Sequence, residues 1–189
     1  SGPAAKKSRA QIVDTPYENL HLIAASGELA DLQPKLEAKF KINKLRRLLD
    51  DISEDYDRIY IDTPPAMNFY SFSALIAADA VLIPFDCDTF ARQALYQVLA
   101  QVTELQADHN ESLVVEGIVI NHYMSTTGFH PNLVEELIKE GLPILPAYLG
   151  SSVKMRESHE RCLPLIHLDR LHKLTGQFVE LLNVLEEAS

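Results

Sequence analysis

Short apolar runs alternate along this chain with apolar residues at helical spacing. Runs rich in β-forming residues and bounded by turn residues predict five strands, at 20–25, 58–61, 80–85, 113–121 and 144–146. Apolar residues three or four positions apart predict helices at 32–52 (broken near Asn43), 71–78, 90–105, 131–140, 151–161 and 168–185. Helices that separate strands imply parallel crossovers. We therefore expect a doubly wound, mostly parallel α/β sheet with helices on both faces.

Residues typical of helix ends define the predicted boundaries of two of these helices. Pro131 suits the first position of its helix, where no backbone N–H is needed, and Gly141 suits the position after its end. Ser151 or Ser152 is the expected N-cap of the helix at 151–161, because a serine oxygen can accept from a free backbone N–H.

Composition limits the classes of protein that need consideration. The 189 residues are 47% apolar, enough for one domain with a substantial core, which we place at 15–189 after a loop or cloning remnant at 1–14. No apolar run is long enough for a membrane helix. The net charge of −10 argues against a generally DNA-coating surface but leaves a local basic patch open. Cys87 and Cys162 lack a metal-type spacing and are interpreted as free thiols.

The most informative segment is 56–65, Tyr-Asp-Arg-Ile-Tyr-Ile-Asp-Thr-Pro-Pro. Its apolar part predicts a buried parallel strand that ends at Asp62, and the two prolines stop the strand. Ligands of parallel sheets bind beyond the carboxyl ends of the strands. Asp62 therefore stands where a carboxylate can hold hydrated Mg²⁺ beside a phosphate. The alternative is an Asp that only caps the next turn.

A phosphate-binding loop is missing from this sequence. No G-x-x-x-x-G-K-[ST] occurs, and the seven glycines never cluster. Backbone N–H groups of such a loop, with its Lys, hold the phosphates, so Asp62 alone cannot bind a nucleoside triphosphate tightly. Two explanations stay open: an N-terminally incomplete piece of a larger ATPase, or a paralogue that has lost nucleotide binding. We favour the first, because the chain starts with Ser1 and no initiator Met.

The order of motifs resembles the ParA family of partitioning ATPases, within the ParA/MinD/Soj group. Residues 56–65 are similar to the family's Y-D-x-I-x-I-D-T-P-P, and residues 74–84 to its A-L-x-A-A-D-x-V-L-I-P. Residues 117–121 match a G-x-x-x-N strand, and residues 145–158 give a weaker match. The resemblance covers about residues 15–185. It implies a P-loop ATPase fold whose first strands, P-loop and upstream acidic motif are absent from this chain.

The resemblance also implies a nucleotide site. Asp62 would order the Mg²⁺ shell through water, and Thr63 would lie next to the γ-phosphate. Asn121 would read the adenine edge, with Pro146 and Tyr148 along the base. The alternatives are a turn hydroxyl for Thr63, a turn-forming Asn121 and a packed surface Tyr148.

The same resemblance implies phosphate contacts to DNA by Lys154, Arg156 and Arg161, contacts that position a protein without reading bases. The alternative is a charged, solvated helix face. The acids at 86–88 are interpreted as solvated, with a metal site as the minor alternative.

The expected function is that of an ATPase for plasmid or chromosome partitioning in the bacterial cytoplasm. ATP with Mg²⁺ would be held between two protomers of a homodimer, which would bind nucleoid DNA without sequence preference. A ParB-like partner would stimulate hydrolysis. The alternatives are a P-loop-less interaction module and a relative that positions another cargo. A MinD-like membrane ATPase is disfavoured, because the acidic residues at 186–187 do not suit lipid binding.

Overall fold

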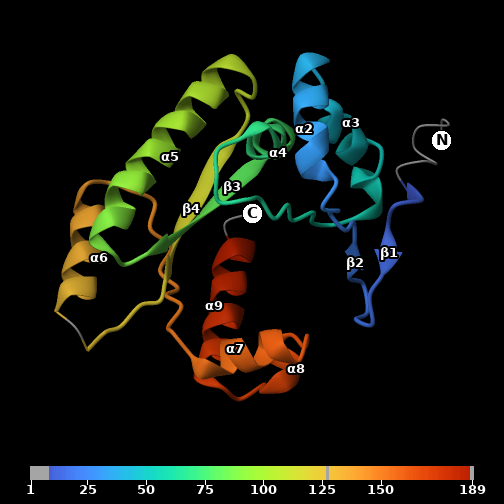
Figure 1. The fold of residues 1–189 in the computed structure, drawn as a ribbon. Helices are drawn as coiled ribbons and strands as arrows, with labels where there is room; N and C mark the ends of the chain where they lie inside the picture. The colour runs from blue at the N-terminus through green and yellow to red at the C-terminus, as the bar shows by residue number, and fades with distance from the viewer. Residues whose placement is uncertain (1–8, 127, 188–189) are drawn as a thin grey trace. The chain divides into compact units, whose positions relative to one another are not determined.

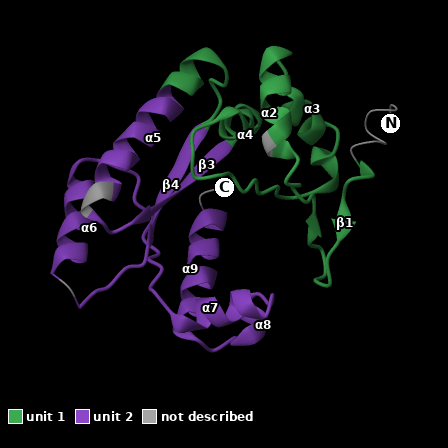
Figure 2. Cartoon of the chain, in the orientation of Figure 1, with its two compact units in different colours: residues 1–79, 104–113 green, residues 80–103, 114–189 purple. Residues whose placement is uncertain are grey.

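The computed structural model describes residues 9–126 and 128–187, so part of the predicted N-terminal loop at 1–14 lies outside the described residues. The chain divides into two compact units (Figure 2). The first unit comprises residues 1–79 and 104–113, and the second comprises residues 80–103 and 114–189. Each unit is described by itself below.

The second unit is built on a parallel strand pair (Figure 1). Strand β3 (Ala80–Asp86) lies beside β4 (Val114–Asn121), so that Asp86 and Asn121 end the two strands opposite each other. The connection between the strands contains helix α5 (Thr89–Asp108). This arrangement confirms the predicted α/β class. The predicted strand at 144–146 is reduced to one parallel bridge, from Ile144 to Ile118.

Side chains alternate between the two faces of this strand pair. On one face, apolar residues of both strands pack with α5 and with α6 (Phe129–Lys139), in a cluster that includes Phe85, Leu95, Ile118, Ile120 and Leu137. On the other face, Val119 packs with Leu145, Leu165, Leu174 and Leu181, from the segment after α6 and from the C-terminal helices. Helices therefore cover both faces of the pair, as the sequence predicted.

The end signals of the helices act as expected at most positions. Gly141 follows α6 with φ of +82°, and Leu142 N donates to Leu137 O, which closes the helix. The helix begins at Phe129, two residues before the predicted first position at Pro131. Ser152 caps α7 (Val153–Glu160) by accepting from the backbone N–H of Lys154.

The predicted C-terminal helix at 168–185 is interrupted. The structure has a short helix α8 (Leu165–Leu168) and a longer helix α9 (Lys173–Glu187). Thr175 Oγ1 donates to the backbone oxygen of Asp169 across the interruption. This contact gives the carbonyl a partner where the helical ladder stops.

Three helices form the body of the first unit (Figure 1): α2 (Leu29–Ala38), α3 (Lys44–Asp50) and α4 (Phe69–Ala77). Both α2 and α3 contact α4. The predicted break near Asn43 is confirmed and begins at Phe40, whose φ is +52°. Asn68 caps α4 by accepting from the backbone N–H groups of Tyr70 and Ser71. A 3₁₀ turn η1 (Ser53–Asp55) follows α3.

Two strand predictions in the first unit are wrong. Residues 58–61 form no strand, and Ile59 and Tyr60 are 40% and 69% exposed. A strand gains its hydrogen bonds only from a neighbour, and no described strand pairs with this segment. The predicted strand at 20–25 is limited to β2 (His21–Leu22). It pairs antiparallel with β1 (Val13–Asp14) and not in a parallel sheet.

Candidate functional site

Asp62 lies in the irregular segment that leads from η1 toward α4. Its side chain is exposed, and the described part of the chain supplies it with no hydrogen bond or ion pair. No group of three or more His, Cys, Asp or Glu suited to a metal occurs among the described residues. A lone accessible carboxylate fits Mg²⁺, which keeps several waters and takes one or two protein carboxylates together with phosphate oxygens. Thr63, next to it, is also exposed.

Asn121 lies at the carboxyl end of β4, where its side chain is already engaged. Asn121 Nδ2 donates to Asp86 Oδ1 at 2.9 Å. The other oxygen of Asp86, Oδ2, is 3.3 Å from His122 Nδ1. The Asp86 carboxylate thus contacts both Asn121 and His122, at the end of the neighbouring strand β4. The side-chain oxygen of Asn121, Oδ1, has no recorded donor among the described residues and is the atom that remains available for a ligand.

The interpretation of Asp86 as a solvated acid agrees with its side chain, which is 53% exposed. The sequence did not predict that the same carboxylate contacts Asn121 and His122. A signal was present in the sequence: Asn121 closes the predicted strand at 113–121, and Asp86 directly follows the predicted strand at 80–85. Neighbouring parallel strands place such residues at the same edge of a sheet.

Tyr148 packs against a second tyrosine. The rings of Tyr148 and Tyr123 have centroids 4.8 Å apart at an interplanar angle of 54°. Burial raises the pKa of the Tyr148 phenol. Leu149 N donates to Ile120 O, so this segment runs along β4, with Pro146 exposed.

The structure does not bring the side chains of Asn121 and Tyr148 together on one face. Tyr148 packs on the cluster that contains Ile120, whereas strand alternation places Asn121 on the face of Val119. Asp62 and Thr63 belong to the first unit, and Asn121, Pro146 and Tyr148 to the second.

Two of the three basic residues at α7 and its C-terminal end share one carboxylate. Lys154 Nζ lies 2.8 Å from Glu157 Oε2, and an Arg161 nitrogen lies 2.7 Å from Glu157 Oε1. The hydrogen bond from Lys154 lowers the pKa of the Glu157 carboxyl, and the charge of Arg161 acts in the same direction. Arg156 is exposed, and no ion pair is recorded for it within the described ranges. A phosphate at α7 would therefore compete with Glu157 for two of the three cations.

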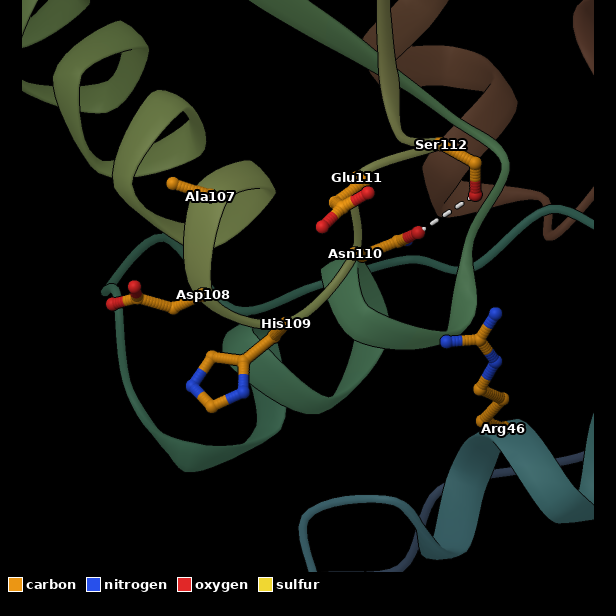
Figure 3. A pocket seen from close by; sticks show the side chains of 7 residues that line it. All are labelled: Arg46, Ala107, Asp108, His109, Asn110, Glu111 and Ser112. Carbon is orange, nitrogen blue, oxygen red and sulfur yellow. Dashed lines mark hydrogen bonds between the residues drawn. The ribbon is translucent and has the colours of Figure 1, made fainter.

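Two hollows occur away from these residues. A polar one of about 350 Å³ lies in the first unit (Figure 3). Arg46 of α3 lines it together with the end of α5 and the following loop, where Ser112 Oγ donates to Asn110 Oδ1. An apolar one of about 720 Å³ is lined by residues of α7, α8 and α9. Neither of the two is lined by a residue that the sequence predicted for nucleotide or DNA binding.

A family profile described as an AAA domain matches residues 4–115, more than half of the chain. The chain belongs to this AAA-domain family, as a ParA/MinD-type member. The chain is 29% identical over 157 residues to the sporulation initiation inhibitor protein Soj of Bacillus subtilis, covering 82% of this chain and 62% of that protein. It is 29% identical over 161 residues to the chromosome-partitioning ATPase Soj of Treponema pallidum, with the same two coverages. The chain thus spans about 62% of the length of these relatives.

Solved structures agree with the fold of this ParA/MinD-type chain. Apo McdA of Cyanothece has a TM-score of 0.82 at 20% identity and covers 98% of this chain and 75% of its own. Cobyrinic acid a,c-diamide synthase of Mycobacterium smegmatis, with bound ATP analog and magnesium, has a TM-score of 0.71 at 26% identity and covers 77% and 58%. The predicted P-loop ATPase fold and the resemblance to the ParA family are confirmed. None of the described helices combines the length and the apolar character that crossing a membrane requires.

Proposed function

We propose that the protein to which this chain belongs is a ParA-type ATPase that partitions plasmid or chromosomal DNA in the cytoplasm. It binds ATP with Mg²⁺, forms a homodimer, binds nucleoid DNA without sequence preference and responds to a ParB-like partner. The observation that carries the proposal is Asp62, the second Asp of the Y-D-x-I-x-I-D-T-P-P motif inside the family match, for which the described residues record no hydrogen bond or ion pair. The naming of a related protein as a chromosome-partitioning ATPase supports the same function.

Each predicted residue has a role in this proposal. Asp62 holds Mg²⁺ through water, and Thr63 lies near the terminal phosphate. The free side-chain oxygen of Asn121 accepts from the exocyclic amine of adenine, with the exposed Pro146 beside the base. Tyr148 takes its place beside the base only by leaving Tyr123, because its ring packs on the other face of the strand pair. Bound Mg²⁺ supplies charge neutralisation on the phosphate oxygens, and the protein supplies positioning.

Phosphate release by the complete gene product, with Asp62→Ala, tests the proposal. We expect turnover to fall by at least about a hundredfold, because a charge-stabilising contact is lost at the phosphates. Asp50→Ala is the matched control: it removes an exposed carboxylate from α3 in the same unit and should leave turnover unchanged. Equal turnover in the two variants would remove Asp62 from the site. Absence of turnover in the wild type as well would favour the interaction-module alternative.

DNA binding completes the proposed cycle. Phosphate contacts by Lys154, Arg156 and Arg161 would make binding insensitive to base sequence and sensitive to salt. Arg156 is the residue of the three that we expect to contribute most, because Glu157 competes with phosphate for the other two.

A further inference from the structure

A second, stronger concentration of positive charge occurs in the first unit. Residues 35–47 contain six basic side chains and one acidic side chain, a formal charge of +5 within a chain of net charge −10. We call residues 35–47 the basic segment. Its cations are Lys35, Lys39, Lys41, Lys44, Arg46 and Arg47. A local charge of this size against an acidic background creates a field that attracts polyanions.

The cations of the basic segment are accessible, and the described residues supply them with no ion-pair partner. All six are exposed, and no ion pair to a carboxylate is recorded for any of them within residues 9–126 and 128–187. Glu37, the one acid of the segment, accepts a hydrogen bond from Gln33 at 2.8 Å. The contrast with α7 is direct, since Glu157 there holds both Lys154 and Arg161. Within the described part of the chain, a phosphate that approaches the basic segment breaks no recorded ion pair; Arg46 alone of the six lines the polar hollow with Asp108 and Glu111.

The fold fixes the backbone that carries these side chains. A tight turn joins α2 to α3, with Lys41 N donating to Leu36 O and Lys44 N donating to Lys41 O. Both helices contact α4, and Ile52, just after α3, is 3% exposed. Lys44 and Arg47 are three residues apart on α3 and therefore share a helix face. The cations thus lie on two helices and the turn between them, and the helices are held in place by their contacts with α4.

We infer that the basic segment binds the phosphate backbone of duplex DNA. The inference rests on the proposed partitioning function for the choice of polyanion, and it adds a surface that differs from α7. An anionic membrane is the less favoured partner. Phe40 at the turn is 91% exposed, but a single aromatic side chain supplies little of the apolar area that a stable membrane contact requires.

The test uses this chain, without nucleotide, and a fluorescent duplex of arbitrary sequence in an anisotropy titration over a range of salt. The variant is Lys39→Ala, Lys41→Ala and Lys44→Ala combined. Removal of three phosphate contacts should reduce the slope of log K against log salt by about 3 and weaken binding at least about tenfold near 0.1 M salt. A duplex of a second sequence should bind equally well.

A matched control removes the same charge elsewhere, by Lys139→Ala, Arg170→Ala and Lys173→Ala, all exposed residues of the second unit. This variant should retain the wild-type slope. The inference is overturned if both triple variants lose affinity equally, or if Lys154→Ala with Arg156→Ala and Arg161→Ala abolishes binding while the basic-segment variant binds normally. It is also overturned if the basic-segment variant keeps its DNA affinity but no longer binds vesicles of anionic lipid.

The outcome is separable from that of the proposed function. DNA affinity is measured without ATP, so a failure of turnover in the Asp62 experiment leaves this result standing. Conversely, a normal ATPase whose basic-segment variant binds DNA like the wild type would refute the inference alone.

Discussion

Asn110 is the polar side chain on which the packing of the first unit is expected to depend most. It is 3% exposed, and its Nδ2 lies 3.0 Å from the carbonyl oxygen of Leu75 and 2.8 Å from that of Ala78, at the end of α4. The carbonyl oxygen of Ile76 lies at 3.3 Å. These carbonyls have no further helical partner, because the helix stops there. Asn110 therefore acts as a C-cap supplied from a distant part of the sequence.

The magnitude follows from these contacts. Asn110→Ala removes two well-formed hydrogen bonds to the end of α4, each with a net contribution of about 1 kcal/mol, and leaves buried acceptors unsatisfied at about 1–3 kcal/mol. It also removes the acceptor of the Ser112 hydroxyl, which is partly exposed and contributes less. We expect the free energy of unfolding to fall by about 2–4 kcal/mol, which corresponds to a decrease in Tm of about 4–16 °C for a chain of this length. Asn110→Asp, of the same shape, should also destabilise the protein at neutral pH, because it directs a carboxylate at carbonyl oxygens.

Urea unfolding followed by far-UV circular dichroism measures the effect. Asn183→Ala, at an exposed position of α9, is the control and should change the free energy of unfolding by less than about 0.5 kcal/mol. If Asn110→Ala behaves like Asn183→Ala, the capping argument is refuted. The Asn110→Asp variant should recover stability as the pH falls toward about 4, where its carboxyl gains a proton and can donate again.

Further predictions concern the glycines and the cysteines. Gly117→Ala should cost about 1–3 kcal/mol in urea unfolding, because an added Cβ would clash with the side chain of Leu145. Gly141→Ala should lower the free energy of unfolding by about 1 kcal/mol through its φ of +82° alone, since a Cβ there meets no atom within 4 Å. An unchanged free energy of unfolding in this variant would contradict the argument. Burial raises the pKa of Cys87 from 9.0 to about 11, so a thiol reagent at pH 8 should modify exposed Cys162 first. The unfolded thiol ionises first as pH rises, so the stability contributed by Cys87 should be complete below pH 9 and lost by about pH 11, which a Cys87→Ala comparison can check.

The prediction from sequence succeeded where short-range chemistry decides structure. Strands β3 and β4 and their parallel order follow from apolar runs separated by a long helical pattern, and Ser152 and Gly141 end or begin helices for reasons of backbone hydrogen bonding and φ. It failed at 58–61, where the apolar run is typical of a strand. The structure contains no described strand beside that run, and an unpaired run cannot form a ladder.

The candidate site shows the same limit. The position of Asn121 at a strand end could be predicted from the sequence, but its bond to Asp86 could not, because the two residues are 35 positions apart and only the parallel register places them opposite each other. The ion pairs of Glu157 with Lys154 and Arg161 differ in this respect, because they join residues three and four positions apart on one helical segment and so follow from sequence spacing.

The sequence by itself determined the α/β class, the ParA-type motifs and the helix ends, because each of these depends on residues within a few positions of one another. Only the tertiary structure decided which strands are paired, which face each side chain occupies and which partner the polar residues at the strand ends have. These properties depend on contacts between residues far apart in the chain, and their free energies arise only when the chain has folded and brought the partners together.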